Sequence, residues 1–305
     1  MASERQTYAK AGVSIEKAGA VVERLRAAVE STGATGFGAF AGLHPLDETR
    51  LLAASTDSVG TKLILARTRG ALRNCGADLA AHCINDVLTC GAEPLLFLDY
   101  VAANRIELEQ VAELVEGAAE VCREAGCAIL GGETAELPGI YKKDELDFAG
   151  TCVGIVDRRD LIDGSRVEPG DVVVGFPSAG IHANGFTLVR RLVGEDDFDA
   201  ELLLLPTRLY LEDVHALRAS ADVRALAHVT GGGLMGNLPR ALPDGVRVEL
   251  DWDSWERPPV FAWLADLGVE EEELRRVFNC GIGMCAVVPA SAAAGGLVIG
   301  RVVDA

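Results

Sequence analysis

The chain alternates short apolar segments with amphipathic helical segments, and it does so on both sides of a connecting stretch at 163–171. Alternating strand-like and helix-like segments are typical of sheets covered by helices. We therefore expect an α/β (α+β) protein with two domains, at 1–163 and 164–305. A length of 305 residues is sufficient for two cores. The stretch between them contains Gly164, Pro169 and Gly170, which favour a linker.

The spacing of apolar residues assigns helices and strands within each half. In the first half it predicts helices at 15–30, 77–90 and 108–125, and strands at 51–55, 95–101, 127–130 and 148–156. In the second half it predicts helices at 184–192 and 207–217, and strands at 172–176, 246–250, 282–288 and 297–303. We expect the helices of the first half to cover one side of its sheet.

Charge, hydropathy and cysteine spacing exclude several classes of protein. With a net charge of −18, the chain lacks the basic surface that nucleic-acid binding needs. No apolar run is long enough to cross a bilayer and the first ten residues are polar, so we expect a cytoplasmic protein without a membrane helix or secretory signal. The eight cysteines include no Cys-x-x-Cys pair and are interpreted as reduced core thiols. The acidic, lysine-poor surface is compatible with a high-salt habitat, and a GC-rich genome accounts equally well for the arginine excess.

The segment Ser55-Thr56-Asp57-Ser58-Val59-Gly60-Thr61-Lys62 follows an apolar run and combines a carboxylate, hydroxyl groups, a glycine and a lysine. Carboxylate oxygens are ligands of Mg²⁺, and lysine and hydroxyl groups bind phosphate oxygens. It is not a Walker A loop, because Thr61 precedes Lys62 and one glycine is present. Taken alone, the segment fits both a metal-bound nucleotide site and an ordinary polar turn.

Two further clusters place carboxylates beside apolar segments. Asn85 and Asp86 interrupt the predicted helix 77–90, where an aspartate is unfavourable unless a metal, a cation or solvent faces it. Gly131, Gly132 and Glu133 follow the predicted strand 127–130. Their position fits a ligand loop at the edge of an α/β sheet, and it also fits a plain exit from a strand.

Three glycine-rich segments complete the set of candidates. The segment 178–185 leads into a helix, so its backbone N–H groups can face an anion, and His182 within it either moves a proton or only caps the loop. Thr230-Gly231-Gly232-Gly233 repeats this pattern, although glycines also allow two domains to approach closely. The loop Gly33–Gly42 fits a ligand cover or a connecting turn.

Taken in order, these segments resemble the phosphoribosylformylglycinamidine cyclo-ligase family, the aminoimidazole ribonucleotide synthetases of purine biosynthesis. The resemblance extends over nearly the whole chain. The segments that carry it are Tyr8-Ala9-Lys10-Ala11-Gly12-Val13, Thr56–Lys62, Asn85-Asp86, Gly91–Tyr100, Gly131–Gly139, His182-Ala183-Asn184-Gly185, His228–Gly233 and Phe278–Met284.

The resemblance implies a two-domain ATP-binding synthetase fold. Its N-terminal sheet would complete a homodimer interface, and its C-terminal domain would hold a mixed sheet with helices. It also implies that ATP and Mg²⁺ convert formylglycinamidine ribonucleotide to aminoimidazole ribonucleotide. In that reaction the amide oxygen is phosphorylated to an iminophosphate, and the amidine nitrogen then closes the ring.

Matching the motifs residue by residue implies roles for the site residues. Asp57 and Asp86 would bind Mg²⁺, with Glu133 as a further ligand, and His182, Lys62 and Asn184 would be catalytic. The residues implied to contact the nucleotide are Thr56, Ser58, Gly60, Thr61, Lys62, Asn85, Gly131, Gly132, Thr134, Gly231 and Gly232.

The chain departs from the family pattern at a few positions, which affects the expected substrate geometry more than the reaction class. Ser58 and Ala183 stand where the family usually has glycine and serine, and the regions 194–205 and 289–296 look shortened. Two alternatives remain. One is a related ATP-using enzyme of the selenophosphate synthetase, thiamine-monophosphate kinase or hydrogenase-maturation type, and the other is a non-catalytic nucleotide-binding subunit. The first cysteine is Cys75, so the N-terminal catalytic cysteine of a selenophosphate synthetase is absent, and the charged site residues are retained.

Overall fold

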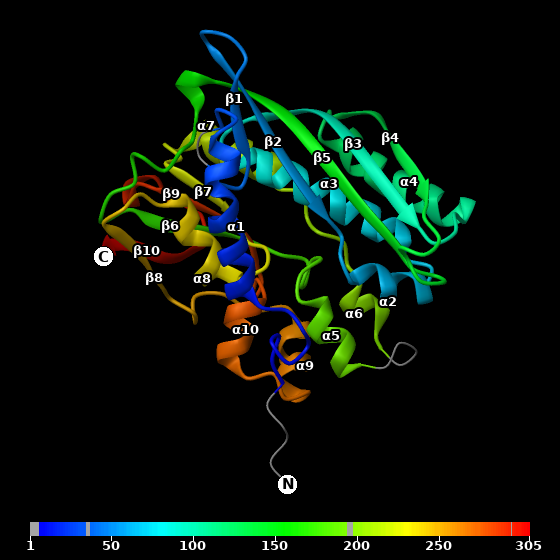
Figure 1. Ribbon diagram of the computed structural model, residues 1–305. Coiled ribbons are helices and arrows are strands. Elements are labelled where there is room, and N and C mark those ends of the chain that lie inside the picture. The colour runs from blue at the N-terminus through cyan, green and yellow to red at the C-terminus, as the bar shows by residue number, and fades with distance from the viewer. Residues whose placement is uncertain (1–5, 35–36, 194–197, 294) are drawn as a thin grey trace.

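The computed structural model describes residues 6–34, 37–193, 198–293 and 295–305. It contains two five-stranded sheets, one from each half of the chain, with helices packed against them (Figure 1). Within these ranges, no helix has the length and apolar character needed to cross a membrane.

The first half forms a mixed sheet in the order β1-β2-β5-β3-β4, in which β3 and β4 are parallel and the other neighbours are antiparallel. Its elements are α1 (Ile15–Glu30), β1 (Gly42–Pro45), β2 (Arg50–Ser58), α2 (Lys62–Thr68), α3 (Leu72–Leu88), β3 (Glu93–Ala103), α4 (Leu108–Glu124), β4 (Ala128–Glu136), β5 (Leu146–Asp157) and the 3₁₀ turn η1 (Arg158–Asp160).

Helix α3 lies against β2, β3 and β5, and α4 packs on α3, so both helices cover the same face of the sheet, as predicted (Figure 1). The two helices approach to backbone contact because each carries a glycine at the crossing. A Cβ atom at Gly76 would lie 1.9 Å from the carbonyl oxygen of Leu114, and one at Gly117 would lie 1.9 Å from that of Arg73. Any side chain at either position would push the helices apart.

The glycine pair Gly131-Gly132 lies inside β4 and not in a loop after it. The predicted strand ended at residue 130, whereas β4 continues to Glu136 in parallel register with β3. Paired glycines normally weaken a strand, but β4 is the edge of the sheet and gains its hydrogen bonds from β3. Glu133 and Thr134 therefore lie on an exposed edge strand.

The second half forms a sheet in the order β7-β9-β6-β10-β8. Its elements are β6 (Val172–Pro177), α5 (Phe186–Leu192), α6 (Ala200–Leu203), α7 (Leu211–Ser220), β7 (Ala225–His228), α8 (Gly233–Asn237), η2 (Leu238–Ala241), β8 (Val246–Leu250), α9 (Pro259–Asp266), α10 (Glu271–Val277), β9 (Ile282–Val288), η3 (Ala290–Ala292) and β10 (Val298–Asp304). The inner strand β9 is buried along its whole length, so both faces of the sheet are covered at this strand.

The expectation of a mixed C-terminal sheet was wrong. All four strand pairs described in it are antiparallel. The sequence pattern identified β6, β8, β9 and β10, but apolar periodicity carries no information about the direction in which strands pair. The mixed sheet of this protein is the N-terminal one.

The predicted helix at 207–217 begins later than expected, because α7 starts at Leu211. The residues before it, 204–210, form an irregular strap that crosses α3. Asn74 donates to the carbonyl oxygen of Leu204 (2.9 Å), and Asn85 donates to that of Arg208 (2.9 Å). These tertiary hydrogen bonds replace the helical ones that the local pattern favoured.

Candidate functional site

Asp57 and Asp86 come together around a pair of histidines. The Nδ1 atom of His82 is 3.5 Å from Oδ2 of Asp57, and Nδ1 of His228 is 2.8 Å from Oδ1 of Asp86. The two imidazole rings meet edge to face with centroids 5.1 Å apart. The group of Asp57, His82, Asp86 and His228 is called the central cluster below.

The central cluster forms where β2, α3 and β7 meet. Along β2, Ala53, Ser55 and Asp57 point to the face that α3 covers, since side chains of a strand alternate between faces. His82 and Asp86 are four residues apart on α3 and therefore share one side of that helix. His228 is the last residue of β7 in the other sheet, so the cluster joins the two halves of the chain.

Two of the predicted loops also reach the central cluster. The Nδ2 atom of Asn184 lies 3.5 Å from Nε2 of His82. A Cβ atom placed on Gly231 would lie 3.6 Å from Oδ1 of Asn184. The loop 178–185 therefore adjoins the central cluster through His82, and the glycines after β7 adjoin that loop.

The charges of the cluster depend on burial and on the carboxylates. Burial alone favours the neutral form of His82, but the hydrogen bond and charge of Asp57 outweigh it and raise the pKa of His82. Burial opposes the charge of Asp57 as well, yet the hydrogen bond from His82 lowers the pKa of Asp57 overall. For His228, burial outweighs the partner Asp86 and the pKa is lowered. Asp57 therefore favours the protonated form of His82, whereas burial favours the neutral form of His228.

His182 is wholly buried with a left-handed backbone (φ 59°), and neither ring nitrogen has a hydrogen-bond partner among the described residues. Burial lowers its pKa far below the ordinary value, and the nearby basic groups of His82, His228, Lys62 and Arg208 lower it further. His182 is therefore neutral at pH 7, in the form that accepts or relays a proton.

This neutral histidine predicts a pH dependence of stability. The pKa of His182 lies below the value of about 6.5 that it has in the unfolded chain, so the unfolded state binds the extra proton in the interval between the two. The free energy of unfolding should then rise with pH up to about 6.5, with a slope from His182 of up to about 1.4 kcal/mol per pH unit. The variant His182→Asn, which tolerates φ > 0, should lose this contribution in urea unfolding between pH 5 and 8.

The matched control is His44→Asn, which changes an exposed histidine on β1 and should leave the pH profile of the free energy of unfolding unchanged. If His182→Asn and the wild type had the same slope below pH 6.5, the buried neutral histidine would be contradicted.

Lys62 lies in different surroundings from those that the sequence suggested. Its side chain is wholly buried, and Nζ lies 2.6 Å from Oδ2 of Asp78, 3.0 Å from the carbonyl oxygen of His182 and 2.8 Å from that of Leu205. Its neighbour Thr61 shares a hydrogen bond of 3.1 Å with Thr187. The predicted contact between Lys62 and phosphate stays a prediction, but Lys62 does not face an opening in this structure.

Three more predicted site residues, Asn85, Ser58 and Thr56, lie on α3 and β2. Asn85 is engaged at both ends of its amide, because Nδ2 donates to Arg208 and Oδ1 accepts from the backbone N–H of Tyr210 (3.0 Å). The backbone N–H of Ser58 donates to Oδ1 of Asp57 (2.7 Å), and Ser58 itself is exposed at the end of β2. Thr56 shares a hydrogen bond of 2.6 Å with Thr151 on the exposed face of the sheet.

Glu133 is separated from the central cluster within one chain. The strand register forms one row from Ser58 through Ala149 and Tyr100 to Glu133. Three strand spacings of about 4.8 Å place Glu133 about 14 Å from Ser58. Gly131, Gly132 and Thr134 lie on the same edge strand, so none of these predicted ligands adjoins Asp57 in its own chain.

His82, His228 and Asp78 had no predicted role in the site. His82 precedes Asp86 by four residues on a predicted helix, a spacing that signals a shared face. His228 follows the apolar residues 225–227 and precedes a glycine-rich loop. A polar side chain at the end of a strand lies at the edge of the sheet, where it can reach a site. Asp78 carried no comparable signal, because its partners Lys62 and Thr207 are distant in sequence.

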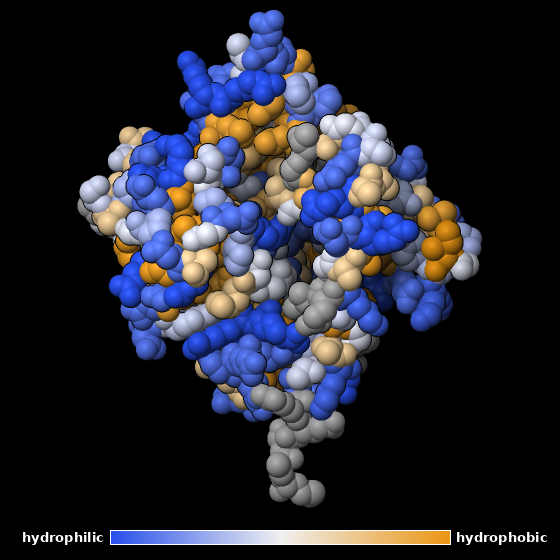
Figure 2. Space-filling model, turned by 60° about the vertical axis from the view of Figure 1, so that its left-hand side comes forward, coloured by the Kyte–Doolittle hydropathy of each residue, from blue (hydrophilic) through white to orange (hydrophobic). Residues whose placement is uncertain are grey.

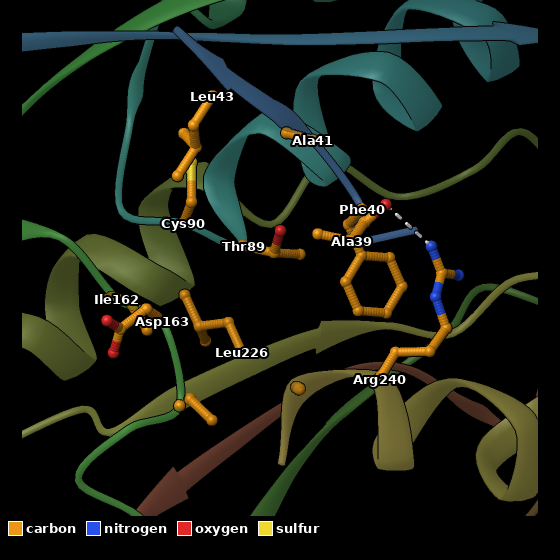
Figure 3. A pocket seen from close by; sticks show the side chains of 13 residues that line it. Ala39, Phe40, Ala41, Leu43, Thr89, Cys90, Ile162, Asp163, Leu226 and Arg240 are labelled. Carbon is orange, nitrogen blue, oxygen red and sulfur yellow. Dashed lines mark hydrogen bonds between the residues drawn. The ribbon is translucent and has the colours of Figure 1, made fainter. Parts of the chain in front are cut away.

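A mostly apolar cavity of about 250 Å³ lies at the junction of the two halves, beyond Thr89 at the end of α3 (Figure 3). Phe40 and Leu43 enter it from one side and Leu226 from β7, while the guanidinium of Arg240 stacks 3.9 Å from the ring centroid of Phe40. Arg240 also donates to the carbonyl oxygen of Ala39 (3.2 Å). The end of the predicted ligand-covering loop 33–42 therefore lines this cavity; residues 35–36 lie outside the described ranges.

Polar and charged side chains cover most of one face of the molecule, and apolar side chains are gathered in a hollow below its upper end (Figure 2). This agrees with the acidic composition and with a surface that stays hydrated.

The central cluster fits a magnesium ion that arrives with a nucleotide. Among the described residues, no three His, Cys, Asp or Glu side chains converge as a metal cage. Mg²⁺ usually binds one or two protein carboxylates and takes its other oxygens from water and phosphates. Asp57 and Asp86 supply two carboxylates in one place, which matches that requirement.

Comparisons with known proteins agree with this geometry. Residues 38–156 match the family "AIR synthase related protein, N-terminal domain", and residues 168–304 match its C-terminal domain. The chain is 45% identical over 304 residues to the phosphoribosylformylglycinamidine cyclo-ligase of Synechococcus sp. (strain CC9605), which covers 93% of this chain and 88% of that protein. It is 46% identical over 304 residues to the cyclo-ligase of Myxococcus xanthus (strain DK1622), at 92% and 88% coverage.

Solved structures of other enzymes share the fold at low identity. Thiamine monophosphate kinase from Aquifex aeolicus is 17% identical, with a TM-score of 0.66 and coverage of 95% of both chains. The hydrogenase maturation protein HypE, solved in complex with ATP, is 22% identical with a TM-score of 0.66, at 85% coverage of this chain and 78% of HypE. These likenesses establish the two-domain fold alone.

Proposed function

The chain belongs to the phosphoribosylformylglycinamidine cyclo-ligase family of purine biosynthesis, whose members are ATP-using ligases, and we propose that the central cluster is its catalytic centre. The observation that carries this proposal is the convergence of Asp57 and Asp86, from two elements of one half, with His228 from the other half. We place the domain boundary at residues 163 and 164, between the two matched ranges.

The substrate that this reaction class requires is formylglycinamidine ribonucleotide. Its formyl amide oxygen is a poor leaving group, so the γ-phosphoryl group of ATP is transferred to that oxygen and ADP leaves. The amidine nitrogen then attacks the formyl carbon, the C–O bond breaks, and phosphate departs with the oxygen. Phosphoryl transfer of this kind depends mainly on positioning and on neutralising charge.

The magnesium-binding role falls to Asp57 and Asp86. Bound Mg²⁺ would neutralise phosphate charge during transfer. His82 and His228 contact the two carboxylates through Nδ1, and Ser55 donates to Oδ2 of Asp86 (2.9 Å). Groups that fix a ligand's orientation in this way normally strengthen metal binding.

The phosphate contacts are proposed for groups around the cluster. They come from Thr56 and Ser58 at the end of β2, from Gly60 and Thr61 after it, and from Gly231 and Gly232 after β7. Asn85 and Lys62, which the sequence also assigned to the nucleotide, support these segments from the interior. His182 would accept or relay the proton of the attacking nitrogen, since its ring is neutral, and Asn184 beside His82 would orient the substrate.

The uncovered face of the first sheet supports a homodimer. Leu98 and Tyr100 alternate onto this face from β3 and are 43% and 37% exposed, and Leu130 on β4 is 65% exposed. An exposed apolar face beside an open edge strand is unfavourable for an isolated chain. We propose that the same face of a second copy covers it.

This dimer would also explain how Glu133 could reach a magnesium site. Since Glu133 lies about 14 Å from Ser58 in its own chain, it could join a magnesium site with Asp57 only from the partner copy. The glycines Gly131 and Gly132 and Thr134 would accompany it on the same strand. Each catalytic centre would then need two chains.

The variant Leu98→Arg should separate the dimer, because it buries a charge against the partner's apolar face. Light scattering coupled to size exclusion should give the wild type twice its chain mass of 32.1 kDa and the variant a single chain mass. Ring-closing activity should fall with the dimer if Glu133 acts in the partner's site.

The matched control is Leu108→Arg, which changes a leucine that is 75% exposed at the start of α4, away from the uncovered sheet face. It should leave both mass and activity unchanged. A wild-type protein that runs as a single chain while retaining full activity would contradict the proposed dimer.

The alternatives receive less support. The kinase and hydrogenase-maturation structures share the fold at 17% and 22% identity, against 45% and 46% for the cyclo-ligases. A non-catalytic subunit would be free to lose its charged site residues, yet Asp57, Asp86 and His182 are all placed around one centre. Incubation with formylglycinamidine ribonucleotide and Mg·ATP, followed by detection of aminoimidazole ribonucleotide, distinguishes these functions.

A further inference from the structure

A wholly enclosed ion pair lies at the junction of the two halves. The side chains of Lys62 and Asp78 are each 0% exposed, and their charged atoms are 2.6 Å apart. Both belong to the first half of the chain, on α2 and α3, but their other partners belong to the second half. Lys62 donates to the carbonyl oxygens of His182 and Leu205, and Asp78 accepts from the backbone and hydroxyl groups of Thr207 at 2.8 and 2.7 Å.

These contacts enclose the ammonium group of Lys62. Nζ donates hydrogen bonds to two carbonyl oxygens and forms an ion pair with Oδ2 of Asp78. The ring of Phe186 covers it at 5.5 Å. Because the Lys62 side chain is 0% exposed, a phosphate oxygen could reach Nζ only if one of these contacts opened.

The strap 204–210 is held along one face of α3. Asn74, Asp78 and Asn85 are four and seven residues apart, which places them on one side of the helix. Asn74 bonds to Leu204, and Asp78 bonds to Thr207. Asn85 bonds to both Arg208 and Tyr210, so the contacts follow the strap in order. A polar stripe on an otherwise buried helix thus has a defined partner in the other half of the chain.

An ion pair enclosed in this way is not needed for stability as such. Desolvation opposes the attraction between two buried charges, and a hydrophobic pair of similar volume is often as stable. What the charges supply here is a fixed arrangement, because each one reaches a backbone group in a loop of the second half. One of those groups belongs to His182, whose left-handed backbone (φ 59°) is unfavourable for a side-chain-bearing residue.

We propose that Lys62 and Asp78 are positioning residues, which clamp the loop 182–184 and the strap 204–210 and so fix His182 and Asn184 at the catalytic centre. This inference rests on the proposed function of the central cluster. It assigns Lys62 an indirect role, in place of the direct phosphate contact that the sequence predicted.

The test is the double variant Lys62→Met/Asp78→Leu, which removes both charges and keeps side chains of similar size. Its kcat for ring closure should fall at least 30-fold, while its Kd for Mg²⁺ with a non-hydrolysable ATP analogue should change less than threefold. The matched control is Arg73→Met/Glu120→Leu, which removes an exposed ion pair of 2.6 Å between α3 and α4 and should change neither value.

Histidine NMR spectra provide a second readout that does not depend on turnover. The imidazole signals of His182 and His82 should move in the Lys62→Met/Asp78→Leu variant, while the signal of His215, exposed on α7, should stay in place. If the wild type formed no aminoimidazole ribonucleotide, the proposed function would fail, yet the spectra would still test the clamp.

The milder variant Thr207→Val keeps the ion pair and removes one hydrogen bond to the strap, so it keeps the test open if the double variant does not fold. We expect it to lower kcat three- to tenfold with the same unchanged Kd. A double variant with kcat within threefold of the wild type and unmoved His182 signals would overturn the proposal. A tenfold weaker Kd with kcat preserved would do the same, because it would mean that Lys62 contacts the nucleotide directly.

Discussion

Replacing Asp57 by asparagine should lower the rate of ATP-dependent ring closure by about 100- to 1,000-fold, the size of effect expected when several kcal/mol of charge stabilisation by a metal are lost. An amide keeps the shape of the side chain but offers Mg²⁺ a neutral oxygen. Asp57 also pairs with His82, so the change removes the partner that raises the pKa of that histidine. Steady-state kinetics at several Mg²⁺ concentrations should show a loss that added Mg²⁺ recovers only in part.

The control for this variant is Asp157→Asn, at the opposite end of the same sheet, where Asp157 pairs in register with Arg50. Its turnover should match that of the wild type. Near-normal turnover of Asp57→Asn would remove Asp57 from the metal site and with it the proposed use of the central cluster.

The variant Lys62→Met should lower the free energy of unfolding by about 3–5 kcal/mol, which is the usual cost of leaving one partner of a buried ion pair uncompensated. The Asp78 carboxylate would remain 0% exposed with its cation removed, although Thr207 still donates to it. The second change in Lys62→Met/Asp78→Leu should recover most of this loss. Urea unfolding of the wild type, the single variant and the double variant measures both effects.

An exposed lysine provides the comparison for this series. Lys142, whose side chain is 88% exposed, should tolerate the same change to methionine within about 0.5 kcal/mol. If Lys62→Met were as stable as Lys142→Met, or if the double variant lost as much as the single one, the ion pair would not be buried in solution as described.

The sequence predicted regular elements best where one local pattern decided the outcome. The ranges of α1, β8 and β9 agree with prediction because their apolar periodicity is unbroken. Prediction from the sequence failed where tertiary contacts override the local preference for a helix or a turn. The residues 207–210 were predicted as the start of a helix but belong to a strap that bonds to α3, and the paired glycines of β4 gain their hydrogen bonds from β3.

The site was predictable in part for a similar reason. Asp57 and Asp86 could be identified because a carboxylate beside an apolar segment is unusual enough to indicate a partner. His82 and His228 stand within apolar segments, where a histidine is most often an ordinary core residue, so only their distances to the carboxylates reveal them. The burial of Lys62 depends on carbonyl groups at residues 182 and 205, which no local pattern connects to it.

The most direct test of the account is to measure both products with purified protein, formylglycinamidine ribonucleotide and Mg·ATP. The wild type should form aminoimidazole ribonucleotide and ADP in equal amounts, because each ring closure uses one phosphoryl group, and Asp57→Asn should form both at least about 100-fold more slowly. ADP formed without aminoimidazole ribonucleotide, or ring closure at the same rate in wild type and variant, would contradict the assignment of this reaction to the central cluster.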